Sequence, residues 1–285
     1  MNQTTLFARV EGLFDVGVLG DAHVLVVGCG SGGGNVALQL VMSGIKHLTL
    51  VDKDILEPEN VIRHVCGAQF LGRPKVDAVA EVLLDRNPSA EVTKLDLDVV
   101  RDARTALLVQ EADVVVLATD NEPSRWLINE LCVRTKTPSC VARVFTRGIG
   151  GEVFAYRPGN GGCLACLEGF LQRTTFRSGI REVDLLNEDE RQKLYGLGVE
   201  EIKDSPGLNI DIAFVTAFHT RFVLDSIARL LPERPKYLSE IPENYLVWGN
   251  RPVAPFDRNF QLQRITLTPQ AGCKICGMAE SNDAI

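Results

Sequence analysis

The apolar positions of this chain fall into short continuous runs that alternate with longer stretches of helical spacing. Residues 23–27 and 112–118 are nearly continuous apolar runs of strand length, as expected for parallel strands that are covered on both faces. Between them, residues 74–84 begin with a proline and repeat apolar positions every three or four residues, which predicts a helix. Strands that alternate with helices in this way indicate a doubly wound α/β fold with a mainly parallel sheet.

One long stretch in the second half of the chain breaks this alternation. Residues 173–206 are rich in charged side chains and show no strand pattern, and loops of this length inside compact domains are usually functional or disordered. We interpret residues 1–285 as a single domain. It would consist of an N-terminal helix (1–20), a nucleotide-binding core (21–172), a crossover excursion (173–206) and a C-terminal part (207–285) with a helix at 209–231 and strands at 245–248 and 262–267.

The composition is that of a soluble globular protein, with 45% apolar and 24% charged residues. A formal net charge of −7 argues against a general nucleic-acid-binding surface, which requires clustered positive charge. No apolar run reaches the ~18 residues of a membrane span, and the first residues have neither the basic end nor the apolar core of a secretory signal. We therefore expect a cytoplasmic protein that binds neither nucleic acid nor membranes.

A glycine-rich turn follows the first apolar run. Gly28, Gly30 and Gly33 have the Gly-x-Gly-x-x-Gly spacing of a nucleotide-binding βαβ unit, and Asp52 follows about 20 residues later, where it would accept a hydrogen bond from a ribose hydroxyl. Phosphate would lie on the helix N-terminus, where backbone N–H groups are free. Because dehydrogenases, methyltransferases and flavoproteins carry similar turns, an NAD-dependent oxidoreductase remains an alternative at this point.

Four polar residues further along the chain favour a triphosphate. Asn60, Arg63 and Lys75 would bring one amide and two cations to the turn, and Asp120 follows the second apolar run at a strand end, where open α/β sheets bind ligands. Cations stabilise phosphate charge and a carboxylate holds a metal, so this set predicts ATP with Mg²⁺. His64 lies beside Arg63, and its role is left open.

The chain also contains two Cys-x-x-Cys pairs, Cys163 with Cys166 and Cys273 with Cys276. A doubled pair with this spacing is typical of a closed four-thiolate zinc site, which is structural. Such a Zn²⁺ site would fix the C-terminal segment to the body of the domain.

These motifs stand in an order that resembles a known family. The order is Gly-x-Gly-x-x-Gly, Asp52-x-Asp54, Asn60-x-x-Arg63, Gly72-Arg73-Pro74-Lys75, Asn87-Pro88, Thr119-Asp120-Asn121 and the two cysteine pairs. It is similar to that of the ThiF/MoeB/HesA superfamily, relatives of the ubiquitin-activating enzymes, over nearly the whole chain. The resemblance implies ATP-dependent adenylation of the C-terminal glycine of a ubiquitin-like or sulfur-carrier protein, with release of pyrophosphate.

The resemblance also implies a role for individual residues. It assigns cofactor binding to Gly28, Gly30, Gly33, Asp52, Asp54, Asn60 and Asn121, and catalysis to Arg9, Arg63, Lys75 and Asp120. Arg63 and Lys75 would contact phosphates and Asp120 would hold Mg²⁺. Arg9 resembles the arginine that an N-terminal helix of the family sends into the site of a second subunit, so a homodimer is implied.

One departure from the family leaves the step after adenylation open. Many relatives carry a reactive cysteine in the crossover segment, whereas residues 173–206 contain none. If the adenylate passes to a thioester and then to a conjugating enzyme, Cys140 or Cys132 would have to form it. Without such a step, a non-catalytic module that binds a ubiquitin-like protein is a further alternative.

Overall fold

The computed structural model describes residues 6–145, 148–174 and 208–278, and they build one eight-stranded sheet. The order of the strands is β3-β2-β1-β4-β5-β6-β7-β8. The strands are β1 (His23–Val27), β2 (His47–Asp52), β3 (Glu91–Asp96), β4 (Val114–Leu117), β5 (Ser139–Val144), β6 (Gly150–Tyr156), β7 (Tyr245–Gly249) and β8 (Gln261–Ile265). Strands β1 to β5 pair in parallel, and β6, β7 and β8 pair antiparallel with their neighbours. The predicted α/β fold with a mainly parallel sheet is confirmed.

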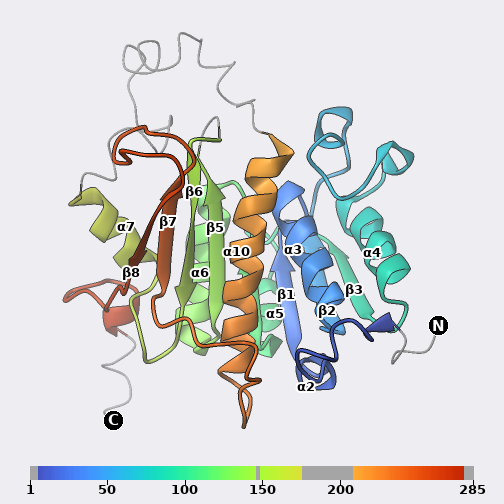
Figure 1. Ribbon diagram of the computed structural model, residues 1–285, viewed down its shortest axis with the longest axis horizontal. Helices are drawn as coiled ribbons and strands as arrows, with labels where there is room; N and C mark the ends of the chain where they lie inside the picture. Colours follow the sequence, from blue (N-terminus) through green and yellow to red (C-terminus); the bar gives the residue numbers. More distant parts are fainter. Residues whose placement is uncertain (1–5, 146–147, 175–207, 279–285) are drawn as a thin grey trace.

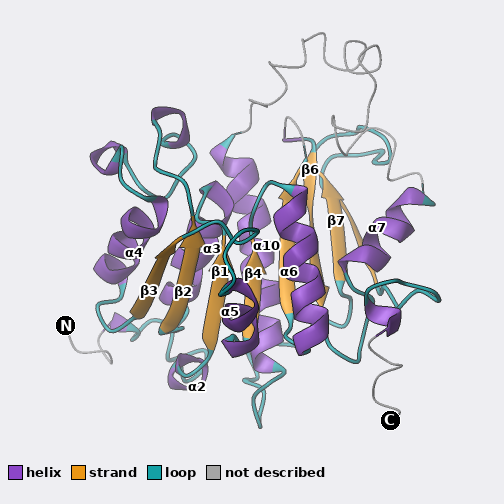
Figure 2. Ribbon diagram, turned by 180° about the vertical axis from the view of Figure 1, so that it is seen from behind, coloured by secondary structure: helices purple, strands orange, loops and turns teal. Residues whose placement is uncertain are grey.

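Helices cover both faces of this sheet. One face carries α3 (Ser31–Met42), α4 (Lys75–Arg86) and α10 (Asn209–Ala228), which lie in front of the strands in Figure 1. The other face carries α5 (Thr105–Glu111), α6 (Glu122–Thr135) and α7 (Leu164–Gln172), as the reverse view in Figure 2 shows. The helices predicted over residues 74–84 and 209–231 correspond to α4 and α10, whereas α7 was not predicted.

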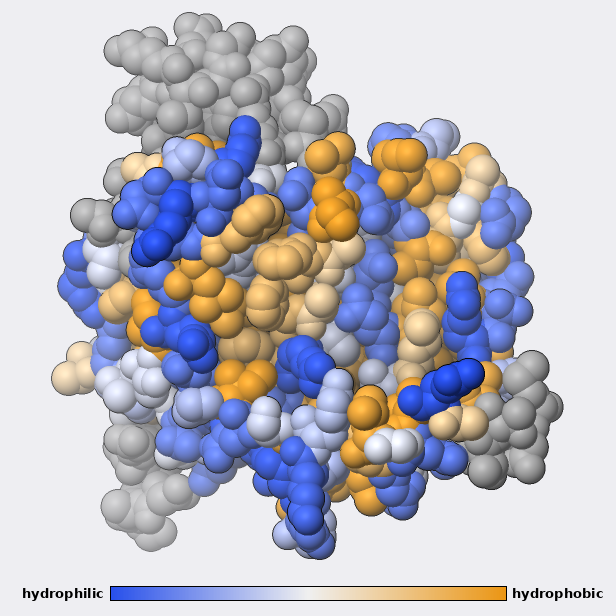
Figure 3. Space-filling view, in the orientation of Figure 1, coloured by the Kyte–Doolittle hydropathy of each residue, from blue (hydrophilic) through white to orange (hydrophobic). Residues whose placement is uncertain are grey.

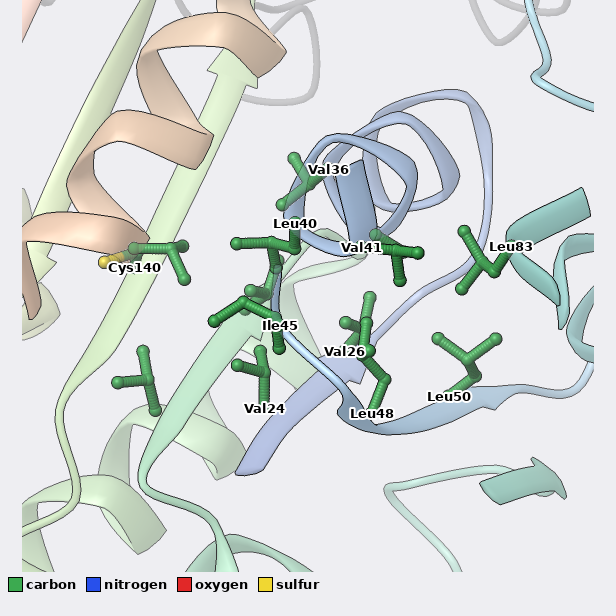
Figure 4. Close-up of a cluster of buried hydrophobic side chains, with 14 of the residues drawn as sticks. Val24, Val26, Val36, Leu40, Val41, Ile45, Leu48, Leu50, Leu83 and Cys140 are labelled. Atoms are coloured by element: carbon green, nitrogen blue, oxygen red, sulfur yellow. The ribbon is translucent and has the colours of Figure 1, made fainter. Parts of the chain in front are cut away.

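Alternation along the strands explains the two layers. In β1, Val24 and Val26 belong to the core beneath α3 and α10, whereas Leu25 and Val27 belong to the core on the opposite face. Figure 4 shows the first of these cores, in which Leu40 from α3 lies among side chains from the neighbouring strands. Both faces of a central strand are thus buried, which is why these strands are continuous apolar runs in the sequence.

Of the N-terminal helix expected over residues 1–20, the structure describes residues 6–20, and residue 6 is helical. Residues 7–13 form turns, and only the four-residue helix α2 (Gly17–Gly20) follows. The Asp15 Oδ1 atom accepts a hydrogen bond from the Gly17 N–H at 2.8 Å, which stabilises the turn that precedes α2. The crossover excursion expected over 173–206 lies, from residue 175 on, outside the described residues.

Apolar side chains are exposed on the face that Figure 1 presents. They gather over α10 and the neighbouring strands in Figure 3. Phe214 of α10 is 41% exposed and Leu262 of β8 is 40% exposed, and the Phe214 ring packs edge-on against Trp248 with 5.5 Å between ring centroids. No helix of the described residues is long and apolar enough to cross a membrane.

The order of the strands also predicts where a ligand binds. β1 lies between β2 and β4: the chain passes from β1 through α3 to β2, and later from β3 through α5 to β4 on the other side of β1. In open α/β sheets, ligands occupy the crevice at the carboxyl ends of the strands beside such a reversal.

Candidate functional site

A pocket of about 660 Å³ lies at the carboxyl ends of β1, β2, β4 and β5. Its size is within the usual range for small-molecule sites, roughly 300–1,000 Å³. Eight of the residues that the sequence singled out line it: Gly28, Gly30, Asp52, Asp54, Arg63, Lys75, Asp120 and Asn121. Gly33, Asn60 and Arg9 are not among its lining residues.

The glycine turn has the shape expected of a phosphate-binding loop. Gly28 has a φ of 93°, a conformation that favours glycine, and a Cβ atom there would lie 2.8 Å from the Ala118 carbonyl oxygen. A Cβ atom on Gly33 would lie only 1.8 Å from the Gly28 carbonyl oxygen, so helix α3 packs against the turn more closely than any side chain allows. Gly30 is the N-cap of α3. The N-terminal N–H groups of this helix therefore face the pocket, where they favour an anion.

Asp52, at the end of β2, is fixed by backbone hydrogen bonds. Its Oδ2 atom accepts from the Cys29 N–H at 2.6 Å, and its Oδ1 atom accepts from the Asp54 N–H at 2.9 Å. Burial raises the pKa of this carboxyl group, although the two N–H donors act in the opposite direction. The carboxylate thus joins the glycine turn to the next loop, and its contact with a ribose remains a prediction.

Lys75 begins α4 and reaches the pocket from the side of β2. A short antiparallel pairing of Ile55 with Pro74, together with the Lys75 N–H bond to the Asp54 carbonyl oxygen at 2.9 Å, joins the two segments. The Lys75 Nζ atom lies 3.0 Å from Asp54 Oδ2, and the lysine side chain is only 12% exposed. A partly buried ammonium at the pocket wall is a suitable phosphate contact because little water screens its charge.

Arg63 lines the pocket from the loop that follows Asn60. The Asn60 side chain accepts a hydrogen bond from the Glu57 N–H at 3.1 Å, and its carbonyl oxygen accepts from the N–H groups of Arg63 and His64. In this structure Asn60 therefore shapes the turn that carries Arg63. The phosphate contact predicted for its amide remains a prediction.

The acid at the end of β4 is exposed. Asp120 lines the pocket between β4 and α6, and Asn121 is the N-cap of α6, with its side chain accepting from the Ser124 N–H at 3.0 Å. The Asn121 oxygen thus stabilises the helix start beside the pocket. Asp120 lines the pocket with an exposed carboxylate, the kind of oxygen ligand that Mg²⁺ prefers, so this residue fits the ion.

One wall of the pocket was missed by the sequence analysis. The segment after β3 contributes Leu97 and Val99 as an apolar surface, and Asp98 as an acid whose Oδ2 atom lies 3.0 Å from Lys53 Nζ. The position of this segment follows from the pairing of β3 with β2, because the carboxyl ends of parallel strands meet at one edge of the sheet. The strand order therefore indicates that this segment lines the pocket, whereas no local sequence motif does.

Arg9 is exposed and lies in the N-terminal turns. Figure 1 shows the N-terminal part of the chain at the end of the sheet opposite the carboxyl ends of the parallel strands. The role predicted for Arg9 concerns the site of a second subunit, so its position within one chain does not test it.

The two Cys-x-x-Cys pairs come together in space. Cys163 and Cys166 lie at the start of α7, Cys273 and Cys276 lie after β8, and all four Sγ atoms are within 4.8 Å of one another. The Sγ atoms of Cys163 and Cys273 are 3.8 Å apart. Zn–S bonds of about 2.3 Å in a tetrahedron place the sulfur atoms about 3.8 Å apart, so this cluster fits zinc. The Gln270 N–H lies 3.3 Å from Cys166 Sγ, a contact that stabilises a thiolate.

The other four cysteines are fully buried. Cys29, Cys66, Cys132 and Cys140 have no exposed surface, and burial raises the pKa of Cys132 and of Cys140 to about 12. A thiol forms a thioester as the accessible thiolate, so these environments are unsuitable for such chemistry. The structure thus gives no support to Cys132 or Cys140 as a thioester-forming residue.

Comparisons with known proteins agree with this geometry. Residues 3–243 match the ThiF family. The chain is 32% identical over 150 residues to "Adenylyltransferase and sulfurtransferase MOCS3" of Danio rerio, covering 52% of this chain and 32% of that protein. It is 34% identical over 168 residues to the protein of the same name from Xenopus laevis, covering 56% of this chain and 36% of that protein. The chain spans about a third of the length of these curated relatives.

Solved structures share the fold. E. coli MccB with ATP has a TM-score of 0.67 at 23% identity, covering 92% of this chain and 69% of the MccB chain. E. coli MccB with AMPCPP and MccA has a TM-score of 0.69 at 21% identity, covering 97% of this chain and 75% of the MccB chain. PaaA has a TM-score of 0.63 at 19% identity, covering 88% of this chain and 75% of the PaaA chain. The family expected from the motif order is confirmed by the match over residues 3–243, and the chain belongs to the ThiF family.

Proposed function

We propose that this protein is an adenylyltransferase that uses ATP and Mg²⁺ to activate the C-terminal carboxylate of a protein or peptide. The observation that carries the proposal is the convergence of Arg63, Lys75 and Asp120 on one pocket beside the glycine turn. Two cations and a second acid suit a triphosphate with a divalent ion better than a dinucleotide. The names of the MOCS3 relatives include an adenylyltransferase activity, which accords with this assignment.

The reaction requires positioning and charge neutralisation rather than a protein nucleophile. A carboxylate oxygen of the substrate attacks the α-phosphorus of ATP, the bond from this phosphorus to the bridging oxygen breaks, and pyrophosphate leaves with that electron pair. The α3 N-terminus would hold phosphate oxygens and Asp52 would fix the ribose. Lys75 and Arg63 would neutralise charge on the leaving pyrophosphate. Mg²⁺, held by Asp120, would supply further neutralisation of the phosphate charge.

For the substrate we propose a ubiquitin-like or sulfur-carrier protein with a C-terminal glycine. An extended glycine tail binds through its backbone, so it needs little space for side chains beside the nucleotide. The apolar surface over α10 and β8, with Phe214 and Leu262 exposed, is of the kind that binds a folded protein partner. In a homodimer, Arg9 of each chain would complete the site of the other.

Pyrophosphate exchange tests this function. Wild-type protein should exchange labelled pyrophosphate into ATP only when a candidate carrier protein with a C-terminal glycine is present, and Asp120→Ala should abolish the exchange. Asp113→Ala is the matched control: Asp113 lies at the opposite end of β4 and accepts from the His23 N–H at 2.8 Å. Near-normal exchange in Asp120→Ala would refute the assignment, and tight NADH binding without ATP binding would favour an oxidoreductase instead.

We further propose that the four-cysteine cluster holds a structural zinc ion. All four sulfurs would be ligands, so the ion would have no open position for substrate. Thiolate ligation of this kind accords with a reducing compartment such as the cytoplasm. Elemental analysis of purified protein should give about one zinc per chain, and protein free of zinc that keeps its full thermal stability would contradict the proposal.

A further inference from the structure

The loop that carries Arg63 is connected to the phosphate turn through His64. This histidine is 8% exposed, and its Nε2 atom lies 2.8 Å from the carbonyl oxygen of Cys29, which belongs to the turn. Its Nδ1 atom accepts a hydrogen bond from the Cys66 N–H at 3.1 Å. The imidazole ring therefore bridges the two loops with both of its nitrogen atoms.

These two contacts determine which ring nitrogen carries the proton. A nitrogen that accepts from an N–H group is unprotonated, so Nδ1 is the acceptor and Nε2–H donates to Cys29. Burial lowers the pKa of His64, which keeps the ring neutral and preserves this arrangement near neutral pH.

The peptide groups of Cys29 are bound on two sides. Its N–H donates to Asp52 Oδ2 at 2.6 Å, and its carbonyl oxygen accepts from His64 at 2.8 Å. The Asp52 carboxylate and the His64 ring thus hold the same residue of the turn from opposite ends. A displacement of the turn is consequently transmitted to the residue beside His64, which is Arg63.

Arg63 has a second backbone tether. Its carbonyl oxygen accepts from the Asn209 Nδ2 atom at 3.0 Å, at the first residue of α10. The backbone of Arg63 is therefore placed between the phosphate turn and α10. A long, flexible arginine side chain reaches a phosphate reproducibly only if its backbone is fixed.

We propose that His64 is a positioning residue that sets the Arg63 guanidinium against the phosphate turn through its hydrogen bond to the Cys29 carbonyl oxygen. This inference rests on the proposed function, because it takes Arg63 as a contact for the phosphates of ATP. His64 itself acts through Arg63 and the turn.

A double-mutant cycle on ATP binding tests this role. His64→Ala should weaken the binding of ATP with Mg²⁺, measured by titration calorimetry, by about tenfold, which corresponds to about 1.4 kcal/mol. If His64 acts through Arg63, the same substitution in an Arg63→Ala background should produce almost no further loss. An equal tenfold loss in both backgrounds would overturn the proposal. His64→Gln should restore most of the affinity, because its amide can donate to Cys29 and accept from Cys66.

Hydrogen exchange provides a readout that does not depend on catalysis. His64→Ala should accelerate amide exchange in residues 61–66, whereas His23→Ala should leave those amides unchanged. His23 is a matched control because its two ring nitrogens also contact two elements, Glu111 O at 3.1 Å and Thr49 Oγ1 at 2.9 Å, at the opposite end of the sheet. Unaltered exchange in residues 61–66 would refute the positioning role. If His64→Ala accelerates exchange in residues 61–66 but the wild-type protein does not bind ATP with Mg²⁺, the proposed function is refuted while the tether is supported.

Discussion

Gly32 and Gly33 are neighbours in the first turn of α3, yet only alanine at Gly33 should destabilise the protein. A Cβ atom on Gly32 would meet nothing within 4 Å. A Cβ atom on Gly33 would lie 1.8 Å from the Gly28 carbonyl oxygen and 3.0 Å from the Ala118 Cβ atom. The first of these contacts is with backbone, which cannot rotate away as a side chain would.

The expected magnitudes follow from these contacts. Replacing glycine by alanine within a helix stabilises a protein by roughly 0.5–1 kcal/mol where the new methyl group has space, so Gly32→Ala should be neutral or stabilising. Gly33→Ala gains the same increment but must separate α3 from the turn by more than about 1 Å to reach ordinary contact. Overpacking of this kind costs typically 1–3 kcal/mol. We expect a net loss of about 1 kcal/mol once the alanine gain is subtracted from the packing cost.

Urea unfolding followed by circular dichroism measures both variants on the same scale. The unfolding midpoint of Gly33→Ala should fall below that of the wild type, while that of Gly32→Ala should equal or exceed it. Because the displaced turn includes Gly28, Gly33→Ala should also weaken ATP binding, since a shift of about 1 Å at a site can cost about a hundredfold. A Gly33→Ala protein as stable as the wild type would show that the close packing of α3 is not required.

Three further predictions concern the cysteines and a buried histidine. Chelation of zinc should lower the melting temperature, and Cys273→Ser should reduce bound zinc to near zero; unchanged zinc content would exclude this cysteine as a ligand. Burial lowers the pKa of His219 to about 4, below its value in the unfolded chain. The contribution of the neutral His219 ring to the free energy of unfolding should therefore be fully present above about pH 6.5 and should fall by about 3 kcal/mol towards pH 4. A His219→Gln variant whose free energy of unfolding depends on pH as steeply as that of the wild type would argue against this cause. Cys132→Ala and Cys140→Ala should each lose about 1 kcal/mol of stability but keep pyrophosphate exchange. If the wild-type protein forms a thiol-sensitive thioester with the carrier protein and either variant does not, that cysteine is the thioester-forming residue.

The elements that the sequence predicted best are those whose signal is local. A central parallel strand is buried on both faces, so β1 and β4 appear as apolar runs, and the glycine turn between β1 and α3 has its own spacing. Asp52 was found from its spacing of about 20 residues after the glycine turn, and Asp120 because it follows the apolar run of β4. The carboxyl ends of the parallel strands bring both to the pocket.

The contacts that local signals missed are those between segments distant in the sequence. The pocket wall formed by Leu97 and Asp98 depends on β3 pairing with β2, and nothing near residue 97 indicates a nucleotide. The His64 contact joins residues that are 35 positions apart. In the sequence His64 is a polar residue beside an arginine, and its function becomes visible only when the Cys29 carbonyl oxygen is placed 2.8 Å away. The motifs therefore identified residues that line the pocket, whereas the contacts that hold those residues in place are determined by the tertiary fold.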